Sequence, residues 1–256
     1  MLKVTTTTLK IIALVAMLID HIGVFIPNMP EYLRWIGRIA APIFIYFVAI
    51  GFRHTSNKKK YLLRLYMASV GMALVNLVLI AMPESNYYGN YNFFAPLFLV
   101  GLFLYAIEKK KFTYILLWQL FSTVPIVFFT EFAVIHRLID KYFLGAVLGN
   151  SLAIEGGILF VLLGVGFYYF QTKKQLTLYY LFFSALIFVI ILKRGHMLEL
   201  HNKIFFKFGD FQWLMILALP LLLLYNGKKG VGLKYFFYFF YPIHIIVLYF
   251  IGRSLQ

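Results

Sequence analysis

The chain has 256 residues, of which 62% are hydrophobic, 20% aromatic and only 13% charged. About a quarter of the residues in a soluble domain are charged, and one soluble core could not bury so many apolar runs of about 16 to 21 residues, so a soluble globular protein is excluded. The net charge of +15 gathers in short clusters between the apolar runs, which argues against nucleic acid as a partner, and the absence of cysteine excludes disulfides and thiolate chemistry.

The apolar runs predict an all-α polytopic membrane protein, a bundle of about nine transmembrane helices (eight to ten) that forms a single domain over residues 1–256. The predicted spans are 9–27, 34–53, 61–82, 93–108, 112–130, 153–171, 175–193, 211–225 and 233–252. The first run lacks a small-residue cleavage site, so we interpret it as a retained helix rather than a signal peptide.

Four basic clusters set the predicted orientation in the lipid bilayer. The clusters RHTSNKKK, EKKK, TKK and NGKK fall in the second, fourth, sixth and eighth connections, which all lie on one face of the membrane. The positive-inside rule makes that face cytoplasmic and places the N-terminus inside and the C-terminus outside. Because the Lys-, Tyr-, Phe- and Ile-rich composition is typical of an AT-rich bacterial genome, we expect a multi-pass protein of a bacterial plasma membrane.

Two longer external connections, residues 131–152 and 194–210, are amphipathic and too polar to span easily. We predict that they cap the outer face as interfacial or re-entrant segments, although simple anchoring to lipid headgroups also accounts for their composition. The second contains the sequence HMLELH, whose two histidines are five residues apart and lack an evident third ligand. The sequence therefore predicts no metal site.

Ionisable side chains occur at membrane depth in three spans: Asp20 and His21 in the first, Arg34 and Arg38 in the second, and His244 in the ninth. Such residues are costly in lipid, which makes them candidates for a functional site. Span direction places His21 and Arg38 at nearly the same level and His244 about a turn deeper, so the set could converge in one cavity in the outer half. Arg34 lies at a helix end, where we interpret it as an interfacial anchor.

Adjacent residues diverge by about 100° around a helix, so Asp20 cannot orient the His21 imidazole. We predict instead that Asp20 pairs with Arg38, which leaves His21 to face the cavity. In the sequence YPIH, Pro242 removes a backbone hydrogen bond and is expected to kink the span and aim His244 inward. Either histidine could alternatively bond only a backbone carbonyl on another helix.

Lys10 precedes His21 by 11 residues, which puts both on one helix face about 16 Å apart. A ligand along that face would hold its anionic end near Lys10 at the cytoplasmic mouth and its reactive end at His21. The pantetheine arm of a coenzyme A thioester has about this reach. The further residues predicted to bind its phosphates at that mouth are Arg53, Lys58, Lys59, Lys60 and Arg64.

Three blocks in this order carry a family resemblance: LKIIALVAMLIDHIG, RWIGRIAAPIFIYFVAIGFRHTSNKKKYLLRL and YPIHIIVLYFI. Together they resemble the TraX family, whose founding activity is acetylation of the N-terminus of a pilin subunit. The family is similar to integral-membrane acyltransferases that have a first-span histidine with a basic residue 11 positions before it, a spacing that Lys10 and His21 match. Arg38 and His244 match the GRIA-P and YP-H blocks.

The resemblance implies acetyl-CoA as co-substrate and an extracytoplasmic acceptor, a protein N-terminus or a glycan, whose identity it does not fix. In the expected reaction His21 acts as general base, Arg38 stabilises the oxyanion or holds Asp20, and His244 positions acceptor or thioester. A ping-pong route through an acetyl-histidine stays open. So do a transporter or flippase coupled to protons through Asp20 and His21, and a non-catalytic subunit of a secretion or conjugation assembly.

Overall fold

The computed structural model describes residues 4–82, 90–131, 139–193 and 211–255, and this part of the chain is almost entirely helical. An isolated bridge joins Val4 and Tyr225. The helices are α1 (Thr6–Phe25), α2 (Tyr32–Gly37), α3 (Ala40–His54), α4 (Lys58–Ala81), α5 (Phe94–Glu108), α6 (Phe112–Glu131), α7 (Lys141–Leu148), α8 (Gly157–Tyr169), α9 (Lys173–Lys193), the 3₁₀ helix η2 (Gln212–Leu217), α11 (Ala218–Leu223) and α12 (Lys234–Ser254).

The predicted fold class is confirmed: the protein is a polytopic helical membrane protein. Within the described residues six helical segments are long and apolar enough to cross a membrane, and three further apolar helices are shorter. Each of the nine predicted spans coincides with one of these nine segments. Large apolar side chains on α6 point outward, since Leu120 and Phe121 are each 70% exposed, which is how a lipid-facing helix differs from a helix in a soluble core.

The chain divides into two compact units. Of the described residues, unit 1 holds 4–47, 169–193 and 211–255, and unit 2 holds 48–82, 90–131 and 139–168. The helix α3 contributes its first half to unit 1 and its second half to unit 2. The single-domain organisation stays a prediction.

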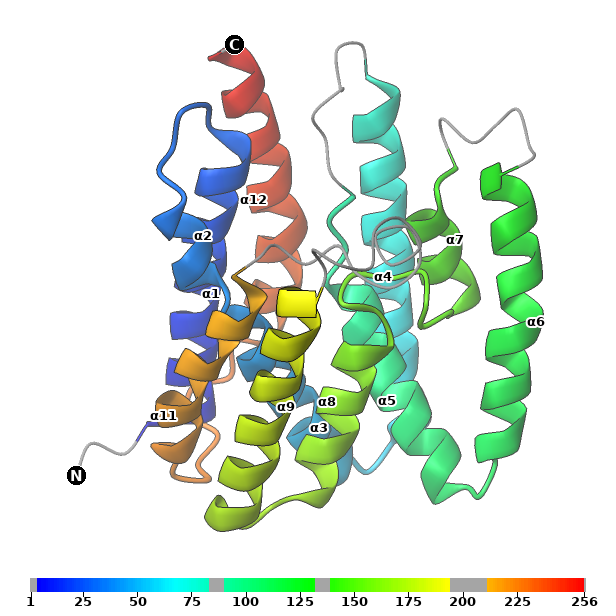
Figure 1. Ribbon diagram of the computed structural model, residues 1–256, viewed down its shortest axis with the longest axis vertical. Coiled ribbons are helices and arrows are strands. Elements are labelled where there is room, and N and C mark those ends of the chain that lie inside the picture. Colours follow the sequence, from blue (N-terminus) through cyan, green and yellow to red (C-terminus); the bar gives the residue numbers. More distant parts are fainter. Residues whose placement is uncertain (1–3, 83–89, 132–138, 194–210, 256) are drawn as a thin grey trace. The chain divides into compact units, whose positions relative to one another are not determined.

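In unit 1, α1 packs against α2 and α12, and small residues allow the close approach (Figure 1). A Cβ atom added to Gly37 on α2 would lie 2.1 Å from the Cβ atom of Asp20. One added to Gly252 on α12 would lie 2.0 Å from the carbonyl oxygen of Phe25. Glycine is therefore required at both contacts, which bring α2 and α12 onto the end of α1 that carries Asp20 and His21.

The second predicted span is interrupted between α2 and α3, at Arg38 and Ile39. The break leaves carbonyl groups of α2 without partners from the next helical turn, and the Nε atom of Arg38 donates to the carbonyl oxygen of Arg34 at 3.0 Å. Pro42 lies in the first turn of α3, where its missing N–H group costs no intrahelical bond. The break thus turns the Arg38 side chain toward the interior of unit 1.

In unit 2, α4 packs against α5 and α7, and α6 packs against α5 and α7. Within the predicted capping segment 131–152, residues 141–148 form α7, which Asp140 caps by accepting from the N–H group of Phe143 at 2.8 Å. The helix ends at Gly149, whose φ of 67° is left-handed. The other predicted capping segment, 194–210, lies outside the described residues, and the capping role of both stays a prediction.

Candidate functional site

Asp20 on α1 forms ion pairs with two arginines of the second span. Arg38 pairs with Asp20 through its Nη2 atom, and Arg34 donates from Nε to the same carboxylate oxygen at 3.2 Å. Asp20 is only 8% exposed, so an unpaired charge at this position would be costly. The predicted pairing of Asp20 with Arg38 is confirmed. The interpretation of Arg34 as an interfacial anchor was wrong, because its side chain turns inward to the carboxylate.

The Arg38 guanidinium uses all three of its nitrogens within unit 1. It donates to Asp20 and to the Arg34 carbonyl oxygen, and also from Nη1 to the Oε1 atom of Gln212 at 2.9 Å. Gln212 begins η2 and is 2% exposed. Three elements, α1, α2 and η2, therefore fix the orientation of one guanidinium.

The charges of this cluster do not cancel. One carboxylate, Asp20, faces two guanidinium groups, Arg34 and Arg38, which leaves one net positive charge among these three described residues. Both guanidinium groups also lie over the ring of Phe211, at 5.5 Å for Arg38 and 5.9 Å for Arg34. Negative charge that develops close to this cluster would be stabilised.

His21 and His244 form a buried pair across α1 and α12. The Nδ1 atom of His21 lies 2.7 Å from the Nε2 atom of His244, and each residue is 5% exposed. The Nδ1 atom of His244 lies 2.8 Å from the carbonyl oxygen of Phe240. The prediction that His244 lies about a turn deeper than His21 was wrong, because two rings at this distance share one level.

The backbone contact fixes the direction of the hydrogen bonds in the neutral pair. A carbonyl oxygen only accepts, so His244 donates from Nδ1 to Phe240 and carries its lone pair on Nε2. His21 then donates from Nδ1 to that lone pair, which assigns the lone pair of His21 to its own Nε2 atom. This row of hydrogen bonds orients the His21 ring and sets its tautomer, as an aligned acid–base catalyst requires.

The two histidines lie among aromatic rings. The rings of Phe240 and His244 are stacked with centroids 4.9 Å apart, and Tyr241 meets the His21 ring edge-on at 6.3 Å. Phe25 lies edge-on to His21 at 6.1 Å on the other side along α1. These contacts hold the imidazoles in an apolar environment, which raises the strength of the hydrogen bond between them.

Lys10 lies at the other end of α1, between rings of two further helices. Its Nζ atom is 5.6 Å from the ring centroid of Phe47 on α3 and 5.7 Å from that of Phe237 on α12. Along α12, Phe237 thus meets Lys10 and His244 meets His21, so α1 and α12 run side by side in the same direction (Figure 1). Lys10 and His21 share one helix face, as predicted from their spacing.

The beginning of α1 is tied to the connection between α11 and α12. The N–H groups of Val4, Thr6 and Thr7 donate to the carbonyl oxygens of Leu224, Lys228 and Lys229 at 3.2, 2.9 and 3.2 Å. Gly230 has a φ of +74°, and a Cβ atom there would lie 2.6 Å from the Oγ1 atom of Thr5. The lysines of the NGKK cluster are therefore at the Lys10 end of α1, on the side where the charge pattern predicts them.

The remaining predicted donor-binding residues belong to unit 2, where two of them have protein partners. Arg53 donates to the carbonyl oxygen of Tyr168 and lies 4.6 Å from its ring centroid. Lys58 forms an ion pair with Glu108. Lys59 and Lys60 are exposed, and the buried Nε atom of Arg64 has no hydrogen-bond partner among the described residues. Their role in binding a donor stays a prediction.

Two described residues of the site were missed or misread in the sequence: Arg34 and Gln212. Arg34 lies four residues before Arg38, a spacing that puts both on one helix face and could have revealed the shared carboxylate. Gln212 is a lone amide in an otherwise apolar segment, which is a weaker signal. In the described residues no three His, Cys, Asp or Glu side chains gather as metal ligands would, and the two histidines of HMLELH lie outside them.

Comparison with known proteins covers nearly the whole chain. The sequence profile of the TraX protein family matches residues 5–252. The chain belongs to the TraX family. This TraX protein is 28% identical to the probable fimbrial assembly protein FimC, serogroup H1, of Dichelobacter nodosus, over 94% of this chain and 92% of that protein. No solved structure matches it.

Proposed function

We propose that this TraX protein is an acetyltransferase of a bacterial plasma membrane that moves an acetyl group from cytoplasmic acetyl-CoA to an amine or hydroxyl at the outer face. The hydrogen-bonded pair of His21 and His244 beside the Asp20 cluster carries the proposal. Buried ionisable groups in a membrane helix are energetically costly, so their presence indicates a functional site. The name of the Dichelobacter nodosus relative, a fimbrial assembly protein, supports a fimbrial or pilin subunit as acceptor.

In the proposed reaction the acceptor nitrogen or oxygen attacks the carbonyl carbon of the thioester. The new C–N or C–O bond forms, the C–S bond breaks, and coenzyme A leaves as a thiolate. His21 takes the acceptor proton on Nε2 and then gives it to the thiolate sulfur, so the products are the acetylated acceptor and free coenzyme A. Proton transfer of this kind contributes about 10² to 10⁴ in rate.

The arginine cluster supports this reaction in two ways. Its one net positive charge favours the oxyanion of the tetrahedral intermediate and the thiolate that leaves. Three of the five Arg38 N–H groups contact Asp20, Gln212 and the Arg34 carbonyl oxygen, so Arg38 positions the cluster and keeps two N–H groups with which it could stabilise the oxyanion.

Lys10 and the neighbouring lysines supply the proposed site for the phosphates of the donor. Lys10 is about 16 Å from His21 along one face of α1, a distance that a pantetheine arm spans. Lys228 and Lys229 lie in the connection that pairs with the first residues of α1, so they add positive charge at the same end. The predicted donor contacts of Arg53, Lys58, Lys59, Lys60 and Arg64 belong to this proposal.

Release of free coenzyme A from acetyl-CoA by the detergent-purified protein tests the proposal without knowledge of the acceptor. We expect slow hydrolysis of the donor by the wild type and by His54→Ala, a matched control at an exposed histidine. Lys10→Ala should raise the donor concentration needed for half-maximal release. Absence of both coenzyme A release and acetyl-CoA-dependent thermal stabilisation in folded wild type would refute the proposal.

A further inference from the structure

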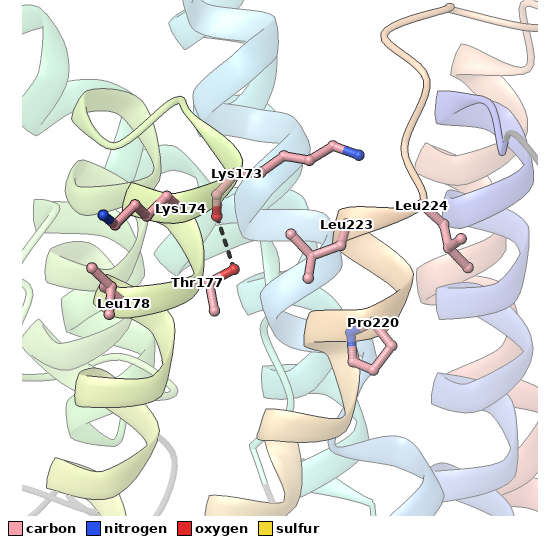
Figure 2. Close-up of a pocket in the computed structure, with 7 residues that line it drawn as sticks. All are labelled: Lys173, Lys174, Thr177, Leu178, Pro220, Leu223 and Leu224. Carbon is pink, nitrogen blue, oxygen red and sulfur yellow. Dashed lines mark hydrogen bonds between the residues drawn. The ribbon is translucent and has the colours of Figure 1, made fainter.

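A cavity of about 560 Å³ opens between α9 and α11 in unit 1, and neither His21 nor His244 lines it (Figure 2). The first turns of α9 supply one wall and the end of α11 supplies the other. The seven lining residues are Lys173, Lys174, Thr177, Leu178, Pro220, Leu223 and Leu224. The size is typical of a site for a small organic ligand.

The lining divides into a cationic part and an apolar part. Lys173 and Lys174 line it with their aliphatic stems, and their ammonium groups extend in opposite directions in the structure (Figure 2), so both long side chains reach one anion only after rotation. Neither lysine forms an ion pair with another residue that the structure describes. The rest of the wall is mainly Pro220 and leucine side chains, of which Leu178 is 59% exposed. Among the described residues no acidic side chain lines the cavity, so a ligand that matches it carries negative charge at one end and hydrocarbon at the other.

The position of the cavity identifies the surroundings from which such a ligand comes. Lys173 is the first residue of α9, a helix long and apolar enough to span the membrane, so the cavity lies at a membrane–water interface. Leu224 accepts a backbone hydrogen bond from Val4, which places this end of α11 beside the start of α1. By the positive-inside prediction that end faces the cytoplasm.

We propose that this cavity binds an anionic phospholipid of the cytoplasmic leaflet. The phosphate pairs with Lys173 and Lys174, and the first methylenes of an acyl chain pack on Leu178, Leu223 and Pro220. Basic pockets at the cytoplasmic ends of transmembrane helices bind anionic headgroups, and the lipid surface there supplies the ligand at high local concentration. The binding does not depend on acetyl transfer.

Titration of dioleoylphosphatidylglycerol into the detergent-purified protein tests this proposal, with the melting temperature as readout. We expect phosphatidylglycerol to raise the melting temperature of the wild type and phosphatidylcholine to leave it unchanged. The variant Lys173→Gln/Lys174→Gln should need about 30-fold more phosphatidylglycerol for half of the effect. The variant Lys109→Gln/Lys111→Gln removes the same charge from another exposed connection and should respond as the wild type does.

Two further arms separate the lipid from other sources of phosphate. Leu178→Ser should weaken the response to phosphatidylglycerol, because it removes apolar contact at a position that is 59% exposed. Glycerol phosphate, the headgroup without acyl chains, should give no stabilisation. Equal stabilisation by glycerol phosphate, or an unchanged lipid response in Lys173→Gln/Lys174→Gln, would overturn the proposal.

Discussion

Unit 1 buries the ionisable residues Asp20, His21 and His244, whereas the buried polar residues described in unit 2 are all amides or hydroxyls. In unit 1 the side chains bond mainly to one another: His21 to His244, and Asp20 to two arginines. An apolar core of the same size would stabilise the fold as well as these buried ionisable groups do, and without the cost of their desolvation. The proposed reaction gives a reason for their presence in unit 1.

The polar side chains of unit 2 bond largely to the backbone. Asn150 donates to the carbonyl oxygen of Gln119 at 3.0 Å, and Gln119 donates to that of Gly149 at 3.0 Å. Gln119 also accepts from the N–H group of Ser151 at 2.6 Å. These bonds fasten the turn after α7 to α6 and satisfy backbone groups that lipid cannot solvate. The buried polar groups of unit 2 thus position the chain.

Removal of Arg38 should give the largest loss of stability. Arg38→Gln leaves the buried Asp20 carboxylate with Arg34 alone, and we expect a cost of about 3 kcal/mol. Arg34→Gln should cost less, up to about 1 kcal/mol, because the Arg34 side chain is 29% exposed and Arg38 keeps the carboxylate paired. Thermal melting of both variants measures the difference, and equal costs would show that the cluster is not centred on Arg38.

Substitution of His244 should separate orientation from donor binding. His244→Ala removes the acceptor of the His21 Nδ1–H group, and we expect coenzyme A release to fall roughly 10- to 100-fold at an unchanged KM for acetyl-CoA. His244→Gln keeps an acceptor and should recover most of the rate. If Ala and Gln lower the rate equally, His244 does not act by orienting His21.

The close contact between α1 and α2 predicts a loss of stability on a small substitution. Gly37→Ala puts a Cβ atom 2.1 Å from the Cβ atom of Asp20, which neither helix can relieve without moving, so we expect a cost of about 2 kcal/mol. Gly71→Ala on α4 is the matched control, because no atom lies within 4 Å of its added Cβ. That variant should be neutral or more stable by about 0.5 kcal/mol. Equal changes in the melting temperatures of Gly37→Ala and Gly71→Ala would contradict a close contact between α1 and α2 at Gly37.

The sequence predicted the helical class, the segments of all nine apolar helices and the pairing of Asp20 with Arg38, because hydropathy and helix spacing are local. It misjudged Arg34, since a position near a helix end does not reveal that the side chain reaches the Asp20 carboxylate on α1. The contact of His21 with His244 joins residues 223 positions apart. Residue spacing carries no information on such a distant pair, and the depth of His244 estimated from span direction was a turn in error.

A substitution in the polar layer of unit 2 should affect stability without affecting chemistry. Asn150→Ala removes hydrogen bonds to the Gln119 carbonyl oxygen and to two hydroxyl groups, and we expect a cost of about 1 kcal/mol or more. The rate of coenzyme A release per folded molecule should equal that of the wild type. A selective loss of activity at full stability would place unit 2 in the reaction and remove the contrast between the two units.

The most direct measurement is the rate of coenzyme A release by His21→Gln, normalised to folded protein by thermal melting. Gln fills much of the space of the imidazole and can donate to His244, but it cannot take up a proton. The account predicts a melting temperature close to that of the wild type and a rate at least about 10²-fold lower. A folded His21→Gln protein that releases coenzyme A at the wild-type rate would contradict the account.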